Sequence, residues 1–257
     1  MFANLVIKDL PSHFKPYEKP FKVEVSPFKV RDVETLASMT DPVQKIEYLL
    51  EGIKLKRSSG VLVDARTLTS MDFYYIGVNR MIVSGFDEMK LVVSCPQGHS
   101  HSYIARMSQL DFDELDVDIP IYLGLSKISS TVRELVLMPD TVGRLIEANS
   151  VGLFGDDLDP LSLLALVIYK YKDFDGNYVD LSVKQAVDLL KELPAVVLGP
   201  LDELATKLAA RLKPLSLTCK TCGTSFEAYP SANLLDVITP FRQPEGASGI
   251  EIRFGDE

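Results

Sequence analysis

The first thirty residues have a strand-like rather than a helical pattern. Over residues 21–25, apolar side chains alternate with charged ones, which is typical of a strand with one buried face. Prolines that interrupt any helix recur through this segment: Pro11, Pro16, Pro20 and Pro27. We therefore predict an extended N-terminal arm over residues 1–30. Its aromatic side chains suit two roles, docking along another subunit or packing on the arm's own domain: Phe14, Tyr17 and Phe21.

A helix and two strands are predicted in the next segment. Asp41-Pro42 combines an N-cap acceptor with a proline at the first helical position, and apolar residues then recur at helical spacing as far as Ile53. The pattern becomes strand-like from Lys90 to Ser94 and again from Ser102 to Met107, on either side of a turn that contains a cysteine. Residues 31–129 are thus predicted to form an α/β part.

The pattern beyond Ser130 is mainly helical. Apolar residues at helical spacing, preceded by capping residues, predict these helices: 139–149, 161–171, 183–192 and 201–212. Strand-like segments return on either side of a second cysteine-bearing turn, at residues 215–218 and 224–229. The sequence therefore predicts an α+β fold with a helical part over residues 130–213. Residues 214–257 are predicted to form a C-terminal hairpin and tail.

The charge balance argues against two classes of partner. The chain of 257 residues has a formal net charge of −9. Nucleic acids and anionic membranes attract basic surfaces, so we expect no nucleic-acid partner and no membrane partner. We also expect no export signal, because the first residues lack a basic segment followed by a long apolar run. Three cysteines are too few for a disulfide framework, which favours a reducing compartment.

The candidate chemistry lies in two similar turns. Knuckle 1 is Leu91–His101, which contains Cys95-Pro96-Gln97-Gly98-His99, and knuckle 2 is Leu215–Thr224, which contains Cys219-Lys220-Thr221-Cys222-Gly223. Each has a strand-like run, a glycine-containing turn with soft ligands, and a second strand-like run. All three cysteines and two of the three histidines of the chain lie in these turns. This is how a zinc ribbon presents its ligands, with two hairpin turns meeting at one tetrahedral ion.

The predicted zinc ligands are Cys95, Cys219 and Cys222, with His99 or His101 as the fourth. His99 is favoured because it lies nearer the turn. Such a closed shell of three thiolates and one imidazole is structural, since it leaves no open position for water or substrate. The prediction requires knuckle 2 to fold back onto knuckle 1, giving a split zinc ribbon.

Two other interpretations of the knuckles remain. The hairpins could persist without metal, or the thiols could carry redox or zinc catalysis. A thioredoxin-like site needs its Cys-x-x-Cys at the start of a helix, but Gly223 and a strand-like run follow Cys222. A zinc deaminase needs His-x-Glu and Pro-Cys-x-x-Cys. Here His101 stands where the glutamate after His99 would be, and a threonine rather than a proline precedes Cys219. No catalytic residue can be named, and we expect the chain not to be an enzyme.

The order of these parts resembles the baseplate protein family of T4-type contractile-tailed bacteriophages, which includes a baseplate hub protein and a hub assembly catalyst. The resemblance is spread over most of the chain. The segments that carry it are Leu10-Pro11-Ser12, Pro16-Tyr17, Val25-Ser26-Pro27-Phe28, the Asp41–Leu55 and Met71–Arg80 helices, Val93-Ser94-Cys95-Pro96, Asp175-Gly176, the helix after Ser182, and Cys219–Gly223 before an apolar run ending at Phe241. In knuckle 1, Gln97-Gly98-His99 stands where the family has a second cysteine.

The resemblance implies a function without reaction chemistry. It implies a baseplate hub subunit or a hub assembly factor that contacts other phage tail and baseplate hub proteins. Such a protein acts in the host cell cytoplasm during assembly, or stays in the tail baseplate of the virion. The alternative from another class is a cellular zinc-ribbon adaptor of the transcription or translation type, against which the acidic charge weighs.

Overall fold

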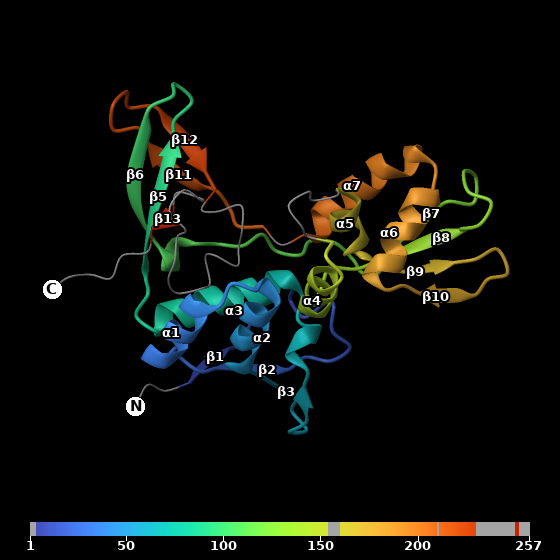
Figure 1. The fold of residues 1–257 in the computed structure, drawn as a ribbon, viewed down its shortest axis with the longest axis horizontal. Coiled ribbons are helices and arrows are strands. Elements are labelled where there is room, and N and C mark those ends of the chain that lie inside the picture. Colours follow the sequence, from blue (N-terminus) through green and yellow to red (C-terminus); the bar gives the residue numbers. More distant parts are fainter. Residues whose placement is uncertain (1–3, 154–159, 210, 230–249, 252–257) are drawn as a thin grey trace.

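The chain folds into helices and antiparallel sheets, as the computed structural model in Figure 1 shows. The structure describes residues 4–153, 160–209, 211–229 and 250–251. The prediction of a mixed α+β fold is confirmed. The apolar run ending at Phe241, and most of the predicted C-terminal tail, lie outside the described residues.

The first unit is a four-stranded antiparallel sheet with helices on one side. Its strands follow one another across the sheet in the order β1-β2-β3-β4. Three helices pack against one face (Figure 1). The elements are β1 (Leu5–Ile7), β2 (Lys22–Val25), α1 (Val30–Ser38), α2 (Pro42–Glu51), β3 (Ile53–Lys56), β4 (Leu62–Val63), a 3-10 turn (Ala65–Thr67) and α3 (Ser70–Val83).

Two helices of this unit start at side-chain caps. The Asp41 carboxylate accepts from the N–H of Val43 with Pro42 at the first helical position, so the predicted start of α2 is confirmed. The Thr69 hydroxyl likewise accepts from the N–H of Asp72 at the start of α3. Both helices then bury their apolar face against the sheet.

The segment predicted as an extended N-terminal arm packs against the first unit. Residues 1–30 supply β1 and β2, and the rings of Phe14, Tyr17 and Phe21 pack edge to face on one another, with Tyr17 and Phe21 centroids 4.8 Å apart. The buried carboxylate of Asp72 accepts from Ser12 Oγ at 2.6 Å and from Tyr17 OH at 2.5 Å. Burial of this apolar surface favours packing on the chain's own domain, which is the second of the two roles considered.

The second unit repeats this design. Its sheet is antiparallel in the order β7-β8-β9-β10, so the region predicted as helical contains strands as well as helices. The elements are β7 (Ile121–Gly124), β8 (Glu134–Leu137), α4 (Val142–Ser150), α5 (Pro160–Ala165), β9 (Ile168–Lys172), β10 (Tyr178–Asp180), α6 (Val183–Glu192), a 3-10 turn (Ala195–Val197) and α7 (Leu198–Leu208). The predicted helix over 161–171 ends at Ala165. The β-branched and aromatic residues that follow favour a strand, and their backbone pairs with β8.

The two units share both topology and loop geometry. In each, two strands, two helices, two strands and a helix follow in the same order along the chain. The first two helices therefore come between the second and third strands, which are neighbours in the sheet. The loops over residues 57–61 and 173–177 each have a glycine at the same position in the left-handed region, Gly60 with φ +86° and Gly176 with φ +92°. The sequences around them also match, with Lys-x-Lys before and Val-Asp after each loop.

Each unit is followed by a hairpin, with α7 preceding the second. The first hairpin is β5 (Glu88–Ser94) and β6 (Ser100–Arg106), followed by a 3-10 turn (Met107–Gln109), and β13 (Ile250–Glu251) pairs with β5. The second is β11 (Leu215–Thr218) and β12 (Ser225–Ala228). The hairpins lie side by side, away from both sheets (Figure 1). Among the described residues, no helix is both long and apolar enough to span a bilayer.

Candidate metal centre

Knuckle 1 is a tight turn between β5 and β6. The Cys95 N–H donates to the His99 carbonyl at 3.0 Å, and the Gly98 N–H donates to the Cys95 carbonyl at 2.8 Å. Gly98 has φ +82°, a conformation that strains any residue with a side chain. The turn closes on the paired Ser94 and Ser100. His99 therefore follows the left-handed glycine directly.

Knuckle 2 has the same construction with one more residue in the turn. The Cys219 N–H donates to the Thr224 carbonyl at 2.9 Å, and the Gly223 N–H donates to the Cys219 carbonyl at 2.9 Å. Gly223 has φ +72°. Here the second ligand, Cys222, comes before the left-handed glycine rather than after it. The shorter turn of knuckle 1 thus accounts for the position of His99, one residue later than a cysteine would stand.

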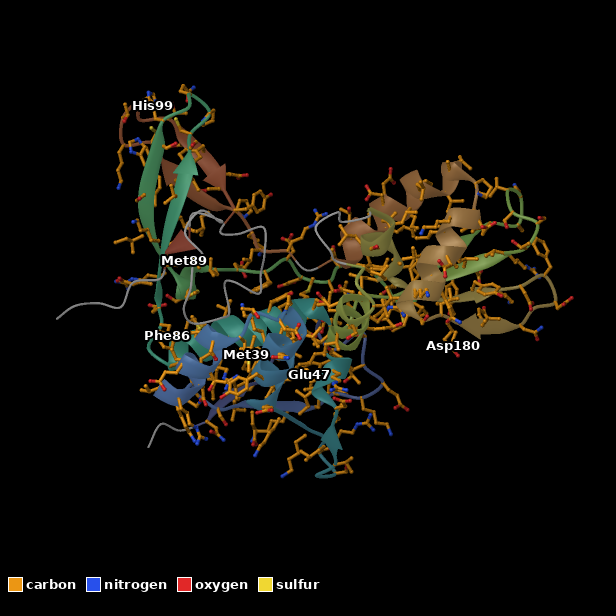
Figure 2. All side chains as sticks on the ribbon, viewed as in Figure 1. Met39, Glu47, Phe86, Met89, His99 and Asp180 are labelled. Carbon is orange, nitrogen blue, oxygen red and sulfur yellow. The ribbon has the colours of Figure 1, made fainter. Side chains whose placement is uncertain are left out.

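The four predicted ligands converge at the ends of the two hairpins. The Cys95 Sγ atom lies 4.0 Å from Cys222 Sγ and 3.5 Å from His99 Nδ1. His99 Nδ1 also lies 3.9 Å from Cys219 Sγ, and the ligand atoms of all four residues lie within 4.8 Å of one another. Figure 2 shows His99 at this end of the molecule. The fold-back of knuckle 2 onto knuckle 1 is therefore present.

These distances fit a tetrahedral zinc ion. Bonds of about 2.3 Å to sulfur and about 2.0 Å to nitrogen place two sulfurs about 3.8 Å apart, and a sulfur and a nitrogen about 3.5 Å apart. The separations of 3.5, 3.9 and 4.0 Å lie close to these edges, and none of the others exceeds 4.8 Å. Thiolates and imidazoles are also the ligands that zinc prefers in closed structural sites. The residues present could hold the ion through Cys95, His99, Cys219 and Cys222.

His101 lies outside the cluster. Its Nε2 atom is 3.0 Å from Thr221 Oγ1, so it contacts knuckle 2 beside the ligands rather than among them. Of the two histidines considered from the sequence, the structure brings His99 to the three thiols. His101 belongs to β6, where its side chain contributes to the contact between the hairpins.

The surroundings of Cys222 and Cys95 lower the pKa of both thiols. Hydrogen bonds between the Cys222 sulfur and the side chain and backbone of Thr224 lower the pKa of Cys222 to about 6. Burial raises the pKa of Cys95, but hydrogen bonds from the backbone N–H groups of His99 and Gln97 outweigh this and leave it lowered. Metal ligation requires the thiolate, so these shifts favour binding of a cation.

The other two ligands respond to their neighbours. Hydrogen bonds with the thiols of Cys95 and Cys222 raise the pKa of His99. Backbone N–H groups lower the pKa of Cys219, but burial and the adjacent thiols raise it above its ordinary value overall. Three thiolates so close together repel one another unless a positive charge lies between them.

Contacts around the ligands fix the two hairpins to each other. Tyr103 OH donates to the Thr218 carbonyl at 3.0 Å, and Lys220 Nζ donates to the Ser102 carbonyl at 2.9 Å. Lys220 Nζ also lies 5.0 Å from the centre of the Tyr103 ring. The roles of Tyr103 and Lys220 were not predicted from the sequence. No spacing signal could have found them, because their partners are more than 100 residues away in the chain.

No relative of the chain is found. Comparison with known proteins yields no matching family model, curated protein or solved structure. The likeness to the phage baseplate family therefore rests on the sequence segments alone.

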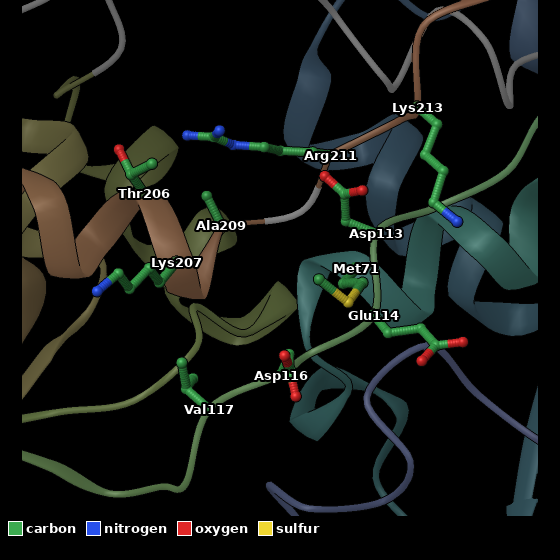
Figure 3. Close-up of a pocket in the computed structure, with 10 residues that line it drawn as sticks. All are labelled: Met71, Asp113, Glu114, Asp116, Val117, Thr206, Lys207, Ala209, Arg211 and Lys213. Atoms are coloured by element: carbon green, nitrogen blue, oxygen red, sulfur yellow. The ribbon is translucent and has the colours of Figure 1, made fainter.

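A second feature with candidate chemistry is a cavity of about 770 Å³ between α7 and residues 113–117 (Figure 3). Its walls carry charges of both signs, with Asp113 and Asp116 on one side and Lys207 on the other. Lys213 on its edge is paired with Asp111 at 2.7 Å. The residues that line the cavity include no cysteine, histidine or serine. They do include the hydroxyl of Thr206 and the carboxylates of Asp113, Glu114 and Asp116.

Proposed function

We propose that Cys95, His99, Cys219 and Cys222 bind one structural zinc ion, and that the chain is a non-enzymatic assembly protein that acts through protein–protein contacts. The observation that carries this proposal is the convergence of four soft ligands from two hairpins about 120 residues apart. Nothing else in the local sequence explains why both turns should place their cysteines at the same point.

The ion would join the two halves of the fold. Each hairpin follows one of the two repeated units, so ligation links the end of the first unit to the end of the second. The ligands are far apart in the chain, and the entropy of bringing them together is offset by the bonds to zinc. Zinc therefore contributes to the folding free energy of the chain rather than to a reaction.

The composition of the site supports a role without catalysis. Four protein ligands complete the coordination shell of zinc and leave no position for substrate. The buried carboxylates Asp72 and Asp140 are occupied in holding the fold: Asp72 accepts from Ser12 and Tyr17, and Asp140 accepts from Ser70 Oγ. The resemblance to the T4-type baseplate family makes a hub subunit or hub assembly factor the proposed role.

Metal analysis tests the site, and complex formation tests the role. Protein purified under reducing conditions should contain about one zinc per chain by elemental analysis. Co-expression with the products of neighbouring tail genes should give a stable complex on size-exclusion chromatography. A reduced, folded sample without metal would overturn the zinc proposal. A gene placed among transcription or translation genes, with no complex with tail proteins, would favour the adaptor alternative.

A further inference from the structure

The outer face of the first sheet is basic, although the chain as a whole is acidic. Alternation along the strands turns Val23 and Leu55 toward the helices and leaves Lys22, Lys54 and Lys56 exposed on the other side. Figure 1 shows the helices on the inner side of this sheet only. One carboxylate, Glu24, lies among these lysines and pairs with Lys22 at 2.9 Å.

A hollow at one end of this face gathers more positive charge. Its volume is about 690 Å³, and its lining includes Lys19, Lys22, Lys56 and Arg57, of which Arg57 pairs with Glu18 at 3.7 Å. Among the described residues, Lys54 and Lys56 make no ion pair of their own. The hydrogen bond and charge of Lys22 lower the pKa of Glu24, and the charges of Lys56 and Lys54 act in the same direction. The face therefore has a positive potential that its single carboxylate does not cancel.

The second unit shows that the fold does not require this charge. At the corresponding positions of its sheet, Lys170 pairs with Asp180 at 2.8 Å, and Lys172 Nζ lies 4.9 Å from the ring centre of Tyr178. Glu134 faces Lys172 across the sheet, where the first unit has Lys22 opposite Lys56. The second unit thus neutralises its two lysines with nearby carboxylates. The first unit instead has a third lysine, Lys22, beside its two.

In the first unit, the counterpart of Asp180 is turned away from the lysines. Asp64 is the aspartate of the matching Val-Asp pair, but its carboxylate accepts from the N–H of Arg66 and caps the 3-10 turn. The outer face of the first sheet therefore keeps an uncompensated charge at an equivalent place in the same architecture. A surface that can be neutralised without loss of fold, yet is not, indicates an anionic partner.

We propose that the outer face of the first sheet, formed by Lys22, Lys54 and Lys56 with the adjoining hollow, is a docking surface for an acidic segment of a partner protein. This proposal rests on the proposed function in protein–protein contacts. Exposed apolar side chains flank the lysines on the same face, Val6 at 38% and Leu62 at 67% exposure, and these suit a protein partner.

A protein partner fits this face better than a nucleic acid. The four strands of the face carry no aromatic side chain on its outer side, and Phe21 in the hollow is only 6% exposed, so a base has no ring to stack on. Glu24 would also repel a continuous phosphate backbone. The net charge of −9 repels a long polyanion wherever it extends beyond the basic face. A short acidic peptide meets the lysines without approaching the rest of the surface.

Binding of a labelled poly-glutamate peptide to the full-length, zinc-loaded protein tests the proposal. Fluorescence anisotropy at about 50 mM salt, where charge contacts are weakly screened, should detect the complex. The double variant K54E/K56E should weaken binding about tenfold. The matched variant K170E/K172E makes the same change in net charge on the second unit and should weaken binding less than about twofold. K54E/K56E should retain the wild-type thermal midpoint, because both lysines are exposed and make no ion pair with any described residue. K170E/K172E breaks the pair of Lys170 with Asp180 and should lower the midpoint by no more than about 4 °C.

The outcomes separate this proposal from its rivals. Equal loss in the two variants would mean that net charge alone attracts the peptide, and would overturn the docking surface, as would no binding by the wild-type protein. Tighter binding of an oligothymidylate of equal length, or of phosphatidylserine vesicles, would assign the face to phosphate groups instead. These results leave the zinc content and the complex with tail proteins unaffected, so failure here does not count against the proposed function.

Discussion

The Sγ atoms of Cys95 and Cys222 lie 4.0 Å apart, although 127 residues separate the two cysteines in the chain. That separation is close to the edge of a zinc–thiolate tetrahedron and about twice the length of a disulfide bond. The two sulfurs are therefore too far apart for a covalent link and close enough to share an ion.

Replacing Cys222 with serine should release the metal. Loss of one thiolate opens the coordination shell, and we expect Cys222→Ser to lower the free energy of unfolding by about 3 kcal/mol or more, because ligation and folding are linked. Zinc content by elemental analysis and urea unfolding measure the two effects. The control His13→Ala lies outside the cluster, between Asp9 and Glu114, and should leave both quantities unchanged. Full zinc content in Cys222→Ser would contradict the assignment.

The two histidines of knuckle 1 should differ in their effect on metal binding. His99→Ala removes a ligand and should weaken zinc binding by at least about a hundredfold, whereas His101→Ala removes the contact with Thr221 and should weaken it less than about fivefold. Competition with a chromophoric chelator measures the affinities. The reverse order of the two effects would make His101 the ligand.

The thiol of Cys222 should be reactive at low pH in metal-free protein. Its pKa of about 6 lies below the ordinary value of about 8.5 for a cysteine, so alkylation by iodoacetamide should reach half its maximal rate near pH 6. Thr224→Val removes the side-chain hydrogen bond and should raise that midpoint. Thr221→Val is the control, because the Thr221 hydroxyl contacts His101, and it should leave the midpoint unchanged. Zinc-loaded protein should be protected from the reagent throughout.

Zinc affinity should rise with pH. The lowered pKa of Cys222 means that its thiolate stabilises the folded state above the ordinary thiol pKa, and that this stabilisation is lost as the pH falls through about 6. The raised pKa of His99 acts against binding at low pH, because the imidazole must lose its proton before it can ligate. Titration from pH 8 to pH 5 should therefore release the metal, with protons taken up. Affinity that does not change with pH would exclude thiolate ligation.

Asp72 should hold the first thirty residues on the fold. Asp72→Ala leaves the buried hydroxyls of Ser12 and Tyr17 without their acceptor, and we expect a loss of about 2–4 kcal/mol in the free energy of unfolding. Limited proteolysis should then cut first near residues 10–20. Tyr17→Phe removes one of these hydrogen bonds and should cost about 1 kcal/mol. Unchanged protease resistance in Asp72→Ala would show that the aromatic packing alone is sufficient.

Local signals predicted the ligands and part of the fold. The cysteines and the glycines of the two turns are adjacent in sequence, so knuckles could be recognised without knowing what lies between them. The cap at Asp41 is local in the same way. The strand at Ile168–Lys172 was missed because an apolar run alone does not distinguish a helix from a buried strand, and pairing with β8 decides the outcome. The packing of Tyr17 on Asp72 depends on a contact 55 residues away.

The four-ligand cluster is divided equally between the two halves of the repeated architecture. Each unit ends in a hairpin that supplies two of the four ligands, so two separate copies of one such unit could form the same site about a two-fold axis. Within one chain, the effective concentration of each half for the other is set by the connecting segment rather than by the amount of protein. A fused pair is also free to diverge. One half can replace a cysteine with His99 and keep a basic sheet face, while the other retains Cys222 and a neutral face, an asymmetry that identical subunits cannot have.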